Sequence, residues 1–375
     1  MNSKHIHIIS FNVPFPANYG GVIDVFYKIK ALHQQGVKIH LHCFEYDRAE
    51  AEILQKYCVS VNYYKRKMGA INLLSPLPFV VVTRSSETLI NNLLKDTYPI
   101  LFEGLHSCFY VNDARLNNRI KIVRTHNIEH DYYTNLASVE KSVFKKIYFT
   151  SESKKLKRFE AVLGKANYVA AISAGDAKEL SKRYKNVHHI TAFHPNEEVK
   201  ILEGKGDFCL YHGNLEVGEN NEAALHLVNK VFSKIKTPLI IAGHNPNKEL
   251  IEAVAQHTHI QLKANISTSQ IDELIKSAQI NVLPTFQATG IKLKLLAALF
   301  IGRFCIVNLP MVVNTGLESL CTIADSPQAM ATAIVTLFEK PFDMAEKQKR
   351  EVILNTAFSN VENAKKLIEL IELFL

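Results

Sequence analysis

The chain has 375 residues, of which 47% are hydrophobic and 21% are charged. This balance is typical of a folded globular protein and excludes wholesale disorder, while the length exceeds one ordinary hydrophobic core and predicts two domains. The net charge of +8 arises in residues 1–200, because residues 201–375 are slightly acidic. This asymmetry indicates that the first half meets an anionic surface.

Membrane-spanning and secretory segments are not predicted. The longest apolar stretch, residues 71–82, is interrupted by Ser75 and two prolines and is too short to cross a bilayer. The first residues lack the pattern of a secretion signal. The six cysteines are scattered without a C-x-x-C pair, which favours a reducing compartment and argues against a cysteine-based metal site. We therefore expect a cytoplasmic protein.

Strand-like apolar runs alternate with helical periodicity along the chain. Strands are predicted at residues 5–11, 38–44, 99–102, 121–124 and 168–172, with a helix over 20–35. A second series of strands follows at 208–211, 238–242, 260–263, 280–283 and 304–307. Such alternation predicts an α/β protein with two Rossmann-like, doubly wound domains.

The domain boundary is expected in the polar stretch 194–207, which contains proline, glycine and charge but has no apolar period. We expect an N-terminal domain over residues 1–195 and a C-terminal domain over residues 196–355. Residues 356–375 are expected to form a C-terminal helix.

A double glycine follows the first predicted strand, in the segment NVPFPANYGG that ends with Tyr19, Gly20 and Gly21. Ligands of doubly wound sheets lie beyond the carboxyl ends of strands, and glycines there let the backbone approach a ligand closely. The segment is not the G-x-G-x-x-G of dinucleotide-binding proteins. A purely structural tight turn is the alternative interpretation.

Two further segments follow predicted strands. RTHNIE places His126 at a strand end, where an imidazole can donate to a sugar hydroxyl or a developing charge. A surface loop with ordinary capping residues explains this segment equally well. YHGNL places Gly213 and Asn214 where a backbone amide can meet an anion, and the helix that follows begins near Glu219.

The segment from Leu283 to Asn308 predicts a strand, a turn at Thr289 and Gly290, and a helix over residues 291–300. Lys292 in the first turn of that helix is unfavourable for the helix dipole unless an anion offsets it. Helix-end amides together with Lys292 and Lys294 form an arrangement that suits a diphosphate. The alternative is a helix cap followed by an exposed lysine pair.

A basic run between Lys141 and Lys165 interleaves lysines with Val143, Phe144 and Ile147. This pattern predicts either a solvated charged face or a surface that contacts a membrane. The sequence shows no aromatic or helix-turn-helix signature for nucleic acid, so no nucleic-acid partner is expected.

Several of these motifs resemble a known family. PFPANYGG, RTHNIE, AIS-x-x-D (Ala171 to Asp176), YHGN and ATGIKLKLLAAL-x-x-G-R together resemble the GT-B glycosyltransferases over nearly the whole chain. The resemblance is strongest to the retaining, family-4-like branch described as glycosyl transferases group 1, which includes capsule, lipopolysaccharide and mannosyl transferases. It implies two Rossmann-like domains facing across a cleft, with the nucleotide-sugar donor on the second and the acceptor on the first. It also implies that no metal is needed and that the C-terminal helix packs back on the first domain.

Single residues carry roles by the same resemblance. Gly20 and Gly21 match the glycine loop near the donor phosphates and the acceptor, and His126 matches the histidine that contacts the donor sugar. Gly213 matches the glycine beneath the phosphates. The phosphate-binding turn is matched by Thr289, Gly290 and Lys292.

The chain departs from the family at two places. Thr289 and Ala297 stand where the family has two acidic residues, and the glutamate usually found at the Ala297 position holds the nucleotide ribose. The arginine and lysine that usually follow the glycine strand are replaced by Asn214 and Glu219. Either Lys292 and Lys294 compensate, or the donor differs, or the site is not catalytic.

The sequence therefore predicts a glycosyltransferase that moves a hexose from a nucleotide-diphosphate donor to a glycan or lipid-linked acceptor in surface polysaccharide assembly. His126 and Lys292 are the candidate catalytic residues, and peripheral membrane contact through the basic first half is expected. Two alternatives stay open: a catalytically silent GT-B module that scaffolds an assembly complex, and a sugar-nucleotide epimerase of similar architecture.

Overall fold

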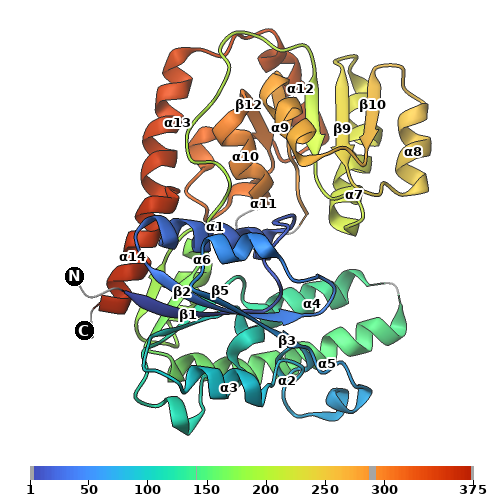
Figure 1. Ribbon diagram of the computed structural model, residues 1–375. Coiled ribbons are helices and arrows are strands. Elements are labelled where there is room, and N and C mark those ends of the chain that lie inside the picture. The colour runs from blue at the N-terminus through green and yellow to red at the C-terminus, as the bar shows by residue number, and fades with distance from the viewer. Residues whose placement is uncertain (1–3, 141, 287–292, 373–375) are drawn as a thin grey trace. The chain divides into compact units, whose positions relative to one another are not determined.

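A computed structural model describes residues 4–140, 142–286 and 293–372 of the chain (Figure 1). The chain divides into two compact units. Unit 1 contains the residues up to Pro195 together with those from Phe358 onward, and unit 2 contains Asn196–Ala357. The last helix of the chain therefore belongs to the same unit as the first strand.

Unit 1 is built on a parallel sheet in the order β3-β2-β1-β4-β5-β6-β7. Its strands are β1 (His5–Ser10), β2 (Lys38–Glu45), β3 (Ser60–Lys65), β4 (Ile100–Glu103), β5 (Lys121–Thr125), β6 (Tyr168–Ala171) and β7 (Val187–His189). Its α-helices are α1 (Gly20–Gln34), α2 (Phe79–Val82), α3 (Glu87–Leu93), α4 (Glu129–Val139), α5 (Val143–Phe159), α6 (Ala174–Ser181) and α14 (Asn360–Glu372). Short helical turns are η1 (Glu52–Lys56), η2 (Ala70–Leu74), η3 (Leu105–Tyr110), η4 (Ala114–Leu116) and η5 (Glu160–Lys165).

Helices cover both faces of the unit 1 sheet, because its strands carry apolar side chains on both sides. Val25 and Ile29 of α1 pack with Leu367 of α14 in the core on one face. The core on the other face includes Leu89 of α3 and Leu156 of α5. Figure 1 shows α1 and α14 on the side of the sheet opposite to α3 and α5.

Unit 2 is a second parallel sheet, in the order β10-β9-β8-β11-β12-β13. Its strands are β8 (Cys209–His212), β9 (Leu239–Gly243), β10 (Ile260–Ala264), β11 (Ile280–Val282), β12 (Phe304–Val307) and β13 (Thr322–Ile323). Its helices are α7 (Gly218–His226), η6 (Leu227–Val231), η7 (Phe232–Lys234), α8 (Lys248–Ala255), α9 (Thr268–Ser277), α10 (Leu293–Ile301), α11 (Leu309–Val312), η8 (Glu318–Leu320), α12 (Pro327–Phe338) and α13 (Met344–Ala357).

Both sheets follow the doubly wound strand order, so the predicted fold class is confirmed. The order reverses between β1 and β4 in unit 1 and between β8 and β11 in unit 2. In open α/β sheets, ligands bind beyond the carboxyl ends of the strands at such reversal points. The fold therefore marks one place in each unit where a site is expected.

Sequence analysis did not predict three of the strands, namely β3, β7 and β13. All three lie at sheet edges. An edge strand has one neighbour and tolerates polar side chains, so β3 (SVNYYK) and β7 (VHH) lack the apolar run that identifies the central strands.

Candidate active site

The glycine loop of unit 1 contacts His126. An added Cβ at Gly21 would lie 2.7 Å from Phe11 Cζ and 3.6 Å from His126 Nδ1, whereas one at Gly20 would meet nothing within 4 Å. The Phe11 ring packs edge-on against the His126 ring, with centroids 5.5 Å apart. Tyr19 precedes helix α1 in extended conformation and is partly exposed. The structure therefore brings the predicted Gly21 and His126 together, and a side chain at position 21 would require the Phe11 ring to shift.

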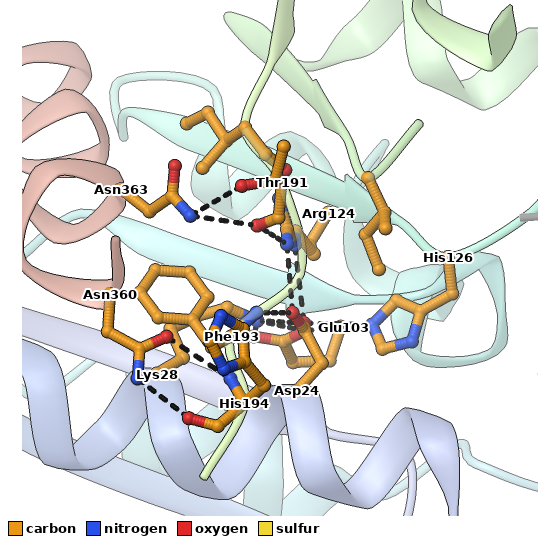
Figure 2. Close-up of polar contacts among 12 residues, drawn as sticks. Asp24, Lys28, Glu103, Arg124, His126, Thr191, Phe193, His194, Asn360 and Asn363 are labelled. Carbon is orange, nitrogen blue, oxygen red and sulfur yellow. Dashed lines mark hydrogen bonds and ion pairs between the residues drawn. The ribbon is translucent and has the colours of Figure 1, made fainter. Parts of the chain in front are cut away.

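Two buried carboxylates face the imidazole of His126 (Figure 2). His126 Nε2 lies 3.1 Å from Glu103 Oε2 and 3.8 Å from Asp24 Oδ2. Glu103 is the last residue of β4, and Asp24 lies on α1. A carboxylate at Nε2 favours the tautomer that carries its proton there, and this leaves Nδ1, on the Gly21 side, as a hydrogen-bond acceptor.

These carboxylates belong to a buried network of charges. Lys28 Nζ donates to Glu103 Oε1 at 2.7 Å and to Asp24 Oδ2 at 2.8 Å. Arg124 Nη2 donates to Asp24 Oδ1 at 2.9 Å. Burial alone would raise the pKa of the Asp24 carboxyl, but Arg124 and Lys28 outweigh it and hold that pKa well below its usual range. The pKa of Glu103 is lowered as well, because Lys28 and His126 outweigh its burial.

Helix α14 is tied to the same network by side-chain amides (Figure 2). Asn363 Nδ2 donates to Thr191 Oγ1 at 2.7 Å, and the carbonyl oxygen of Thr191 accepts from Arg124 Nη2 at 2.9 Å. Asn360 Nδ2 donates to the carbonyl oxygen of His194 at 2.7 Å, and His194 N donates back to Asn360 Oδ1 at 3.1 Å. The C-terminal helix thus holds the segment before residue 195 against the buried charges.

Among the described residues, Asp24, Glu103 and His126 form a group whose potential metal-ligand atoms lie within 4.8 Å of one another. The carboxylate oxygens of that group already accept from Lys28 and Arg124. Two cations therefore balance the two carboxylates, and a divalent ion would have to displace them. This donor set fits a role in orienting His126 better than a role as metal ligands.

Sequence analysis missed Asp24, Lys28 and Glu103. Asp24 and Lys28 are four residues apart on α1, and both lie among its apolar positions Val25 and Ile29. Glu103 ends an otherwise apolar run. Charges inside an apolar pattern were the signal that could have identified them. Of the residues that follow His126, Glu129 is buried with its Oε2 3.9 Å from His106 Nε2, and His130 Nδ1 lies 3.0 Å from Glu160 Oε2.

In unit 2, the predicted glycine turn follows β8. An added Cβ at Gly213 would lie 3.2 Å from Asn220 Cγ, and Asn220 Nδ2 donates to the carbonyl oxygen of Asn214 at 2.9 Å. Tyr211 Oη donates to the carbonyl oxygen of Asn220 at 2.8 Å. These contacts fix the turn against the first residues of α7, while the side chain of Asn214 stays exposed.

Lys294 reaches the glycine turn from α10. Its Nζ donates to Asn220 Oδ1 at 2.8 Å and lies 5.2 Å from the centroid of the Tyr211 ring. Burial lowers the pKa of His212 to about 3, and the Lys294 charge adds to this effect. The predicted Gly213, Asn214 and Lys294 are therefore neighbours at the reversal point of the unit 2 sheet.

A second polar contact closes this edge of the unit 2 sheet. Thr285, just after β11, hydrogen-bonds through its hydroxyl to the carboxylate of Glu219. Its backbone amide donates to Asn308 Oδ1 at 2.9 Å. Glu219 therefore holds the β11 loop. Thr289, Gly290 and Lys292, which the sequence predicted to form the phosphate turn, lie outside the described residues.

The second half of the chain matches a known family. Residues 206–340 match the model of the family described as Glycosyl transferases group 1. An "uncharacterized 44.6 kDa protein in cps region" of Klebsiella pneumoniae is 29% identical over 315 residues, which cover 78% of this chain and 80% of that protein.

Solved structures share the fold at low sequence identity. TarM has a TM-score of 0.69 and 10% identity, with 99% of each chain covered. Anabaena Alr3699/HepE in complex with UDP and glucose has a TM-score of 0.65 and 12% identity, with 98% of each chain covered. A glycosyltransferase from Rickettsia africae has a TM-score of 0.65 and 13% identity, with 99% of this chain and 98% of that chain covered.

Two doubly wound units give the chain the GT-B fold of these solved structures, as its sequence predicted. Residues 206–340, in unit 2, carry the glycosyl transferases group 1 match.

Proposed function

We propose that the chain is a retaining glycosyltransferase that transfers a hexose from a nucleoside-diphosphate sugar on unit 2 to a glycan or lipid-linked acceptor on unit 1. The hydrogen bond from Lys294 to Asn220, whose side chain packs against Gly213, carries the proposal, because it places a cation close to backbone that can approach a diphosphate. The structure of HepE with UDP and glucose supports this class of donor, and the relative in a cps region supports a role in surface polysaccharide assembly.

Charge development explains how these residues would act. In glycosyl transfer the sugar becomes cationic and the leaving diphosphate becomes more negative. A preorganised cation such as Lys294, together with Lys292 as the sequence predicts, lowers the barrier by stabilising the leaving group. His126, held by Glu103, would accept a hydrogen bond from the reacting sugar through Nδ1. The proposed chemistry uses no metal.

Titration calorimetry with UDP, GDP and ADP tests the donor assignment. One nucleotide should bind, and Lys294→Gln should weaken its binding about tenfold or more, since hydrogen bonds to charged groups contribute about 1.5–3 kcal/mol. Lys248→Gln removes an exposed lysine on α8 of the same unit and is the matched control. Binding of none of these nucleotides would favour a catalytically silent scaffold, for which Ala297 in place of the family's acidic residue is the strongest argument.

We also propose that unit 1 contacts a membrane surface. Phe144 at the start of α5 is 87% exposed and Leu74 at the end of η2 is 85% exposed, and Ile71 and Ile147 are exposed beside them in sequence. Lys155 on α5 donates to the carbonyl oxygen of Leu73 at 2.9 Å, which joins the two elements. Exposed apolar side chains among lysines are typical of membrane-surface segments. Within the described ranges, no helix is long and apolar enough to cross a membrane.

Cosedimentation with vesicles that contain anionic phosphatidylglycerol tests the membrane contact. Phe144→Ser should reduce the bound fraction, because an apolar side chain that inserts between lipids loses its favourable transfer energy. Val352→Ser removes an equally apolar, exposed side chain from α13 of unit 2 and should not change binding. Equal binding by Phe144→Ser and the unaltered protein would contradict this surface.

A further inference from the structure

Two arginines come together beyond the carboxyl end of the unit 1 sheet. Arg66 follows β3, and Arg84 follows α2. Arg84 Nε donates to the carbonyl oxygen of Phe11 at 2.8 Å, and its Nη1 donates to that of Val80. Arg66 Nε and Nη2 donate to Thr83 Oγ1 at 3.3 and 3.0 Å. The hydroxyl of Thr83, the neighbour of Arg84 in sequence, thus holds Arg66 close enough for its charge to act on Arg84.

Neither guanidinium has a carboxylate partner in the part of the chain that the structure describes. Arg84 is only 5% exposed, and it donates to two neutral carbonyl oxygens. Burial lowers the pKa of Arg84 to about 9, and Arg66 adds to this effect. The carboxylate of Asp47 acts on both arginines only from a distance and accepts from Asn12 Nδ2 at 2.8 Å. A buried cation beside a second, partly buried cation is costly without a counter-ion, and an anionic ligand removes that cost.

Donors remain for such a ligand. Across the described residues, Arg84 Nη2 and Arg66 Nη1 take part in no hydrogen bond. Nδ1 of His106, in η3 after β4, is buried without a hydrogen-bond partner. Burial, together with Arg84, lowers the pKa of His106 well below its usual value, so the ring is neutral and one of its nitrogens accepts while the other donates.

The carboxyl groups nearest to His106 do not offset the arginines. Glu129 Oε2 lies 3.9 Å from His106 Nε2. Burial raises the pKa of Glu129 to about 8, with Asp176 adding to the rise, so Glu129 is mostly protonated at neutral pH. The positive charges of Arg66 and Arg84 are therefore not neutralised by Glu129 at neutral pH.

The arginines adjoin the candidate catalytic histidine. The Phe11 ring lies beside both His106 and His126, with centroids 5.8 and 5.5 Å away, and its carbonyl oxygen accepts from Arg84. On the other side, Arg66 lies over the Tyr46 ring at 4.5 Å and within electrostatic range of Tyr148 of α5. One end of this surface thus reaches His126, and the other reaches the helix whose first turn is exposed and apolar.

We propose that Arg66 and Arg84 bind the phosphate of the acceptor, and that this phosphate belongs to a lipid-linked acceptor. The chemistry that recognises it is a pair of guanidinium groups, which suits phosphate oxygens in bidentate geometry. The lipid is inferred from the adjoining apolar surface of α5 and η2. This inference rests on the proposed function at one point, because it assigns the bound phosphate to the acceptor of the proposed transfer.

Calorimetry on the full chain, saturated with the nucleotide that it binds so that unit 2 is occupied, tests the site. Inorganic pyrophosphate and farnesyl diphosphate are the probes, because they share the diphosphate and differ in the lipid. Arg66→Gln should weaken the binding of both about tenfold, the effect of losing one charged hydrogen bond. Thr83→Val removes the hydroxyl that Arg66 contacts but keeps both charges, and Arg115→Gln removes an exposed arginine that pairs with Asp113. Arg115→Gln should bind like the unaltered protein, whereas Thr83→Val, which loosens Arg66 without removing its charge, should lose less affinity than Arg66→Gln.

Equal binding by Arg66→Gln and the unaltered protein would overturn the site, as would a loss in Thr83→Val as large as in Arg66→Gln. Farnesyl diphosphate should bind more tightly than pyrophosphate, and equal affinity would overturn the lipid-linked source. If the chain binds no nucleotide, the donor assignment fails. The same titrations without nucleotide still decide whether the arginines bind phosphate, so the two failures are distinguishable. Arg84→Lys, which keeps the charge in the buried position, should retain more affinity than Arg66→Gln.

Discussion

The buried charges around Asp24 give the most quantitative prediction. Asp24 is fully buried and accepts from Lys28 Nζ at 2.8 Å, from the backbone amide of Phe193 at 2.8 Å, and from Arg124. Asp24→Asn keeps the shape of the side chain but leaves two buried cations opposite the single carboxylate of Glu103. Removing one partner of a buried ion pair costs about 3–5 kcal/mol. This is a large part of the roughly 5–15 kcal/mol that stabilises a typical domain.

Urea unfolding at pH 7 measures this loss. Asp131→Asn, which alters an exposed carboxylate on α4, is the control and should change the unfolding free energy by less than about 0.5 kcal/mol. Because the pKa of Asp24 is lowered in the folded state, its contribution is present above the usual carboxyl value of 3.8 and is lost as the pH falls below it. The penalty of Asp24→Asn should therefore shrink in acid. A penalty below about 1 kcal/mol at pH 7 would refute the reasoning, since it would mean that the cations need no partner.

Three further predictions follow from buried groups. Burial lowers the pKa of His7 and that of His194 from 6.5 to about 4, so the unfolded chain binds more protons than the folded chain in this pH range. The urea concentration at the unfolding midpoint should therefore decrease as the pH is lowered from 6.5 to 4. A constant midpoint would contradict this. Gly21→Ala should lower the rate of sugar transfer more than the affinity for nucleotide, because the added Cβ would displace the Phe11 ring that packs on His126. Equal transfer rates for Gly21→Ala and the unaltered protein would show that the close packing of Gly21 and Phe11 is unimportant. Asn363→Ala should lower the free energy of unfolding by about 1–3 kcal/mol, because the buried Thr191 hydroxyl loses this donor. Limited proteolysis should then release α14 faster. An unchanged cleavage rate would contradict the proposed role of Asn363 in holding α14.

The central strands were predictable because burial on both faces demands continuous apolar runs. Residues 121–124 and 304–307 were expected as strands and lie in β5 (Lys121–Thr125) and β12 (Phe304–Val307). The double glycine before residue 22 was read as the entry to a helix, and α1 begins at Gly20. These features depend on local sequence, so periodicity was enough to find them.

The buried charges were not predictable in the same way. Nothing in the sequence around Lys28 shows that its ammonium meets Glu103, which lies 75 residues later. Likewise, nothing in the sequence shows that Arg66 and Arg84 lie close together, or that no described carboxylate pairs with either of them. Such sites come from the way in which strand order brings separate loops to one edge of a sheet.

The family resemblance supplied expectations that local patterns did not. It singled out His126 and Gly21, and the structure places them in contact distance of each other. It also directed attention to Ala297, where the usual acidic residue is missing. The resemblance gave no partner for Glu219 of α7, which the structure shows hydrogen-bonded to Thr285 after β11.

Release of nucleoside diphosphate from a panel of UDP-, GDP- and ADP-sugars, measured by mass spectrometry, tests the central claim most directly. One sugar nucleotide should be consumed in molar excess over the protein, and Lys294→Gln and His126→Ala should each slow its release by about tenfold or more. Failure to consume any sugar nucleotide of the panel, with or without added lipid diphosphate, would contradict the account. So would undiminished release by the Lys294→Gln protein.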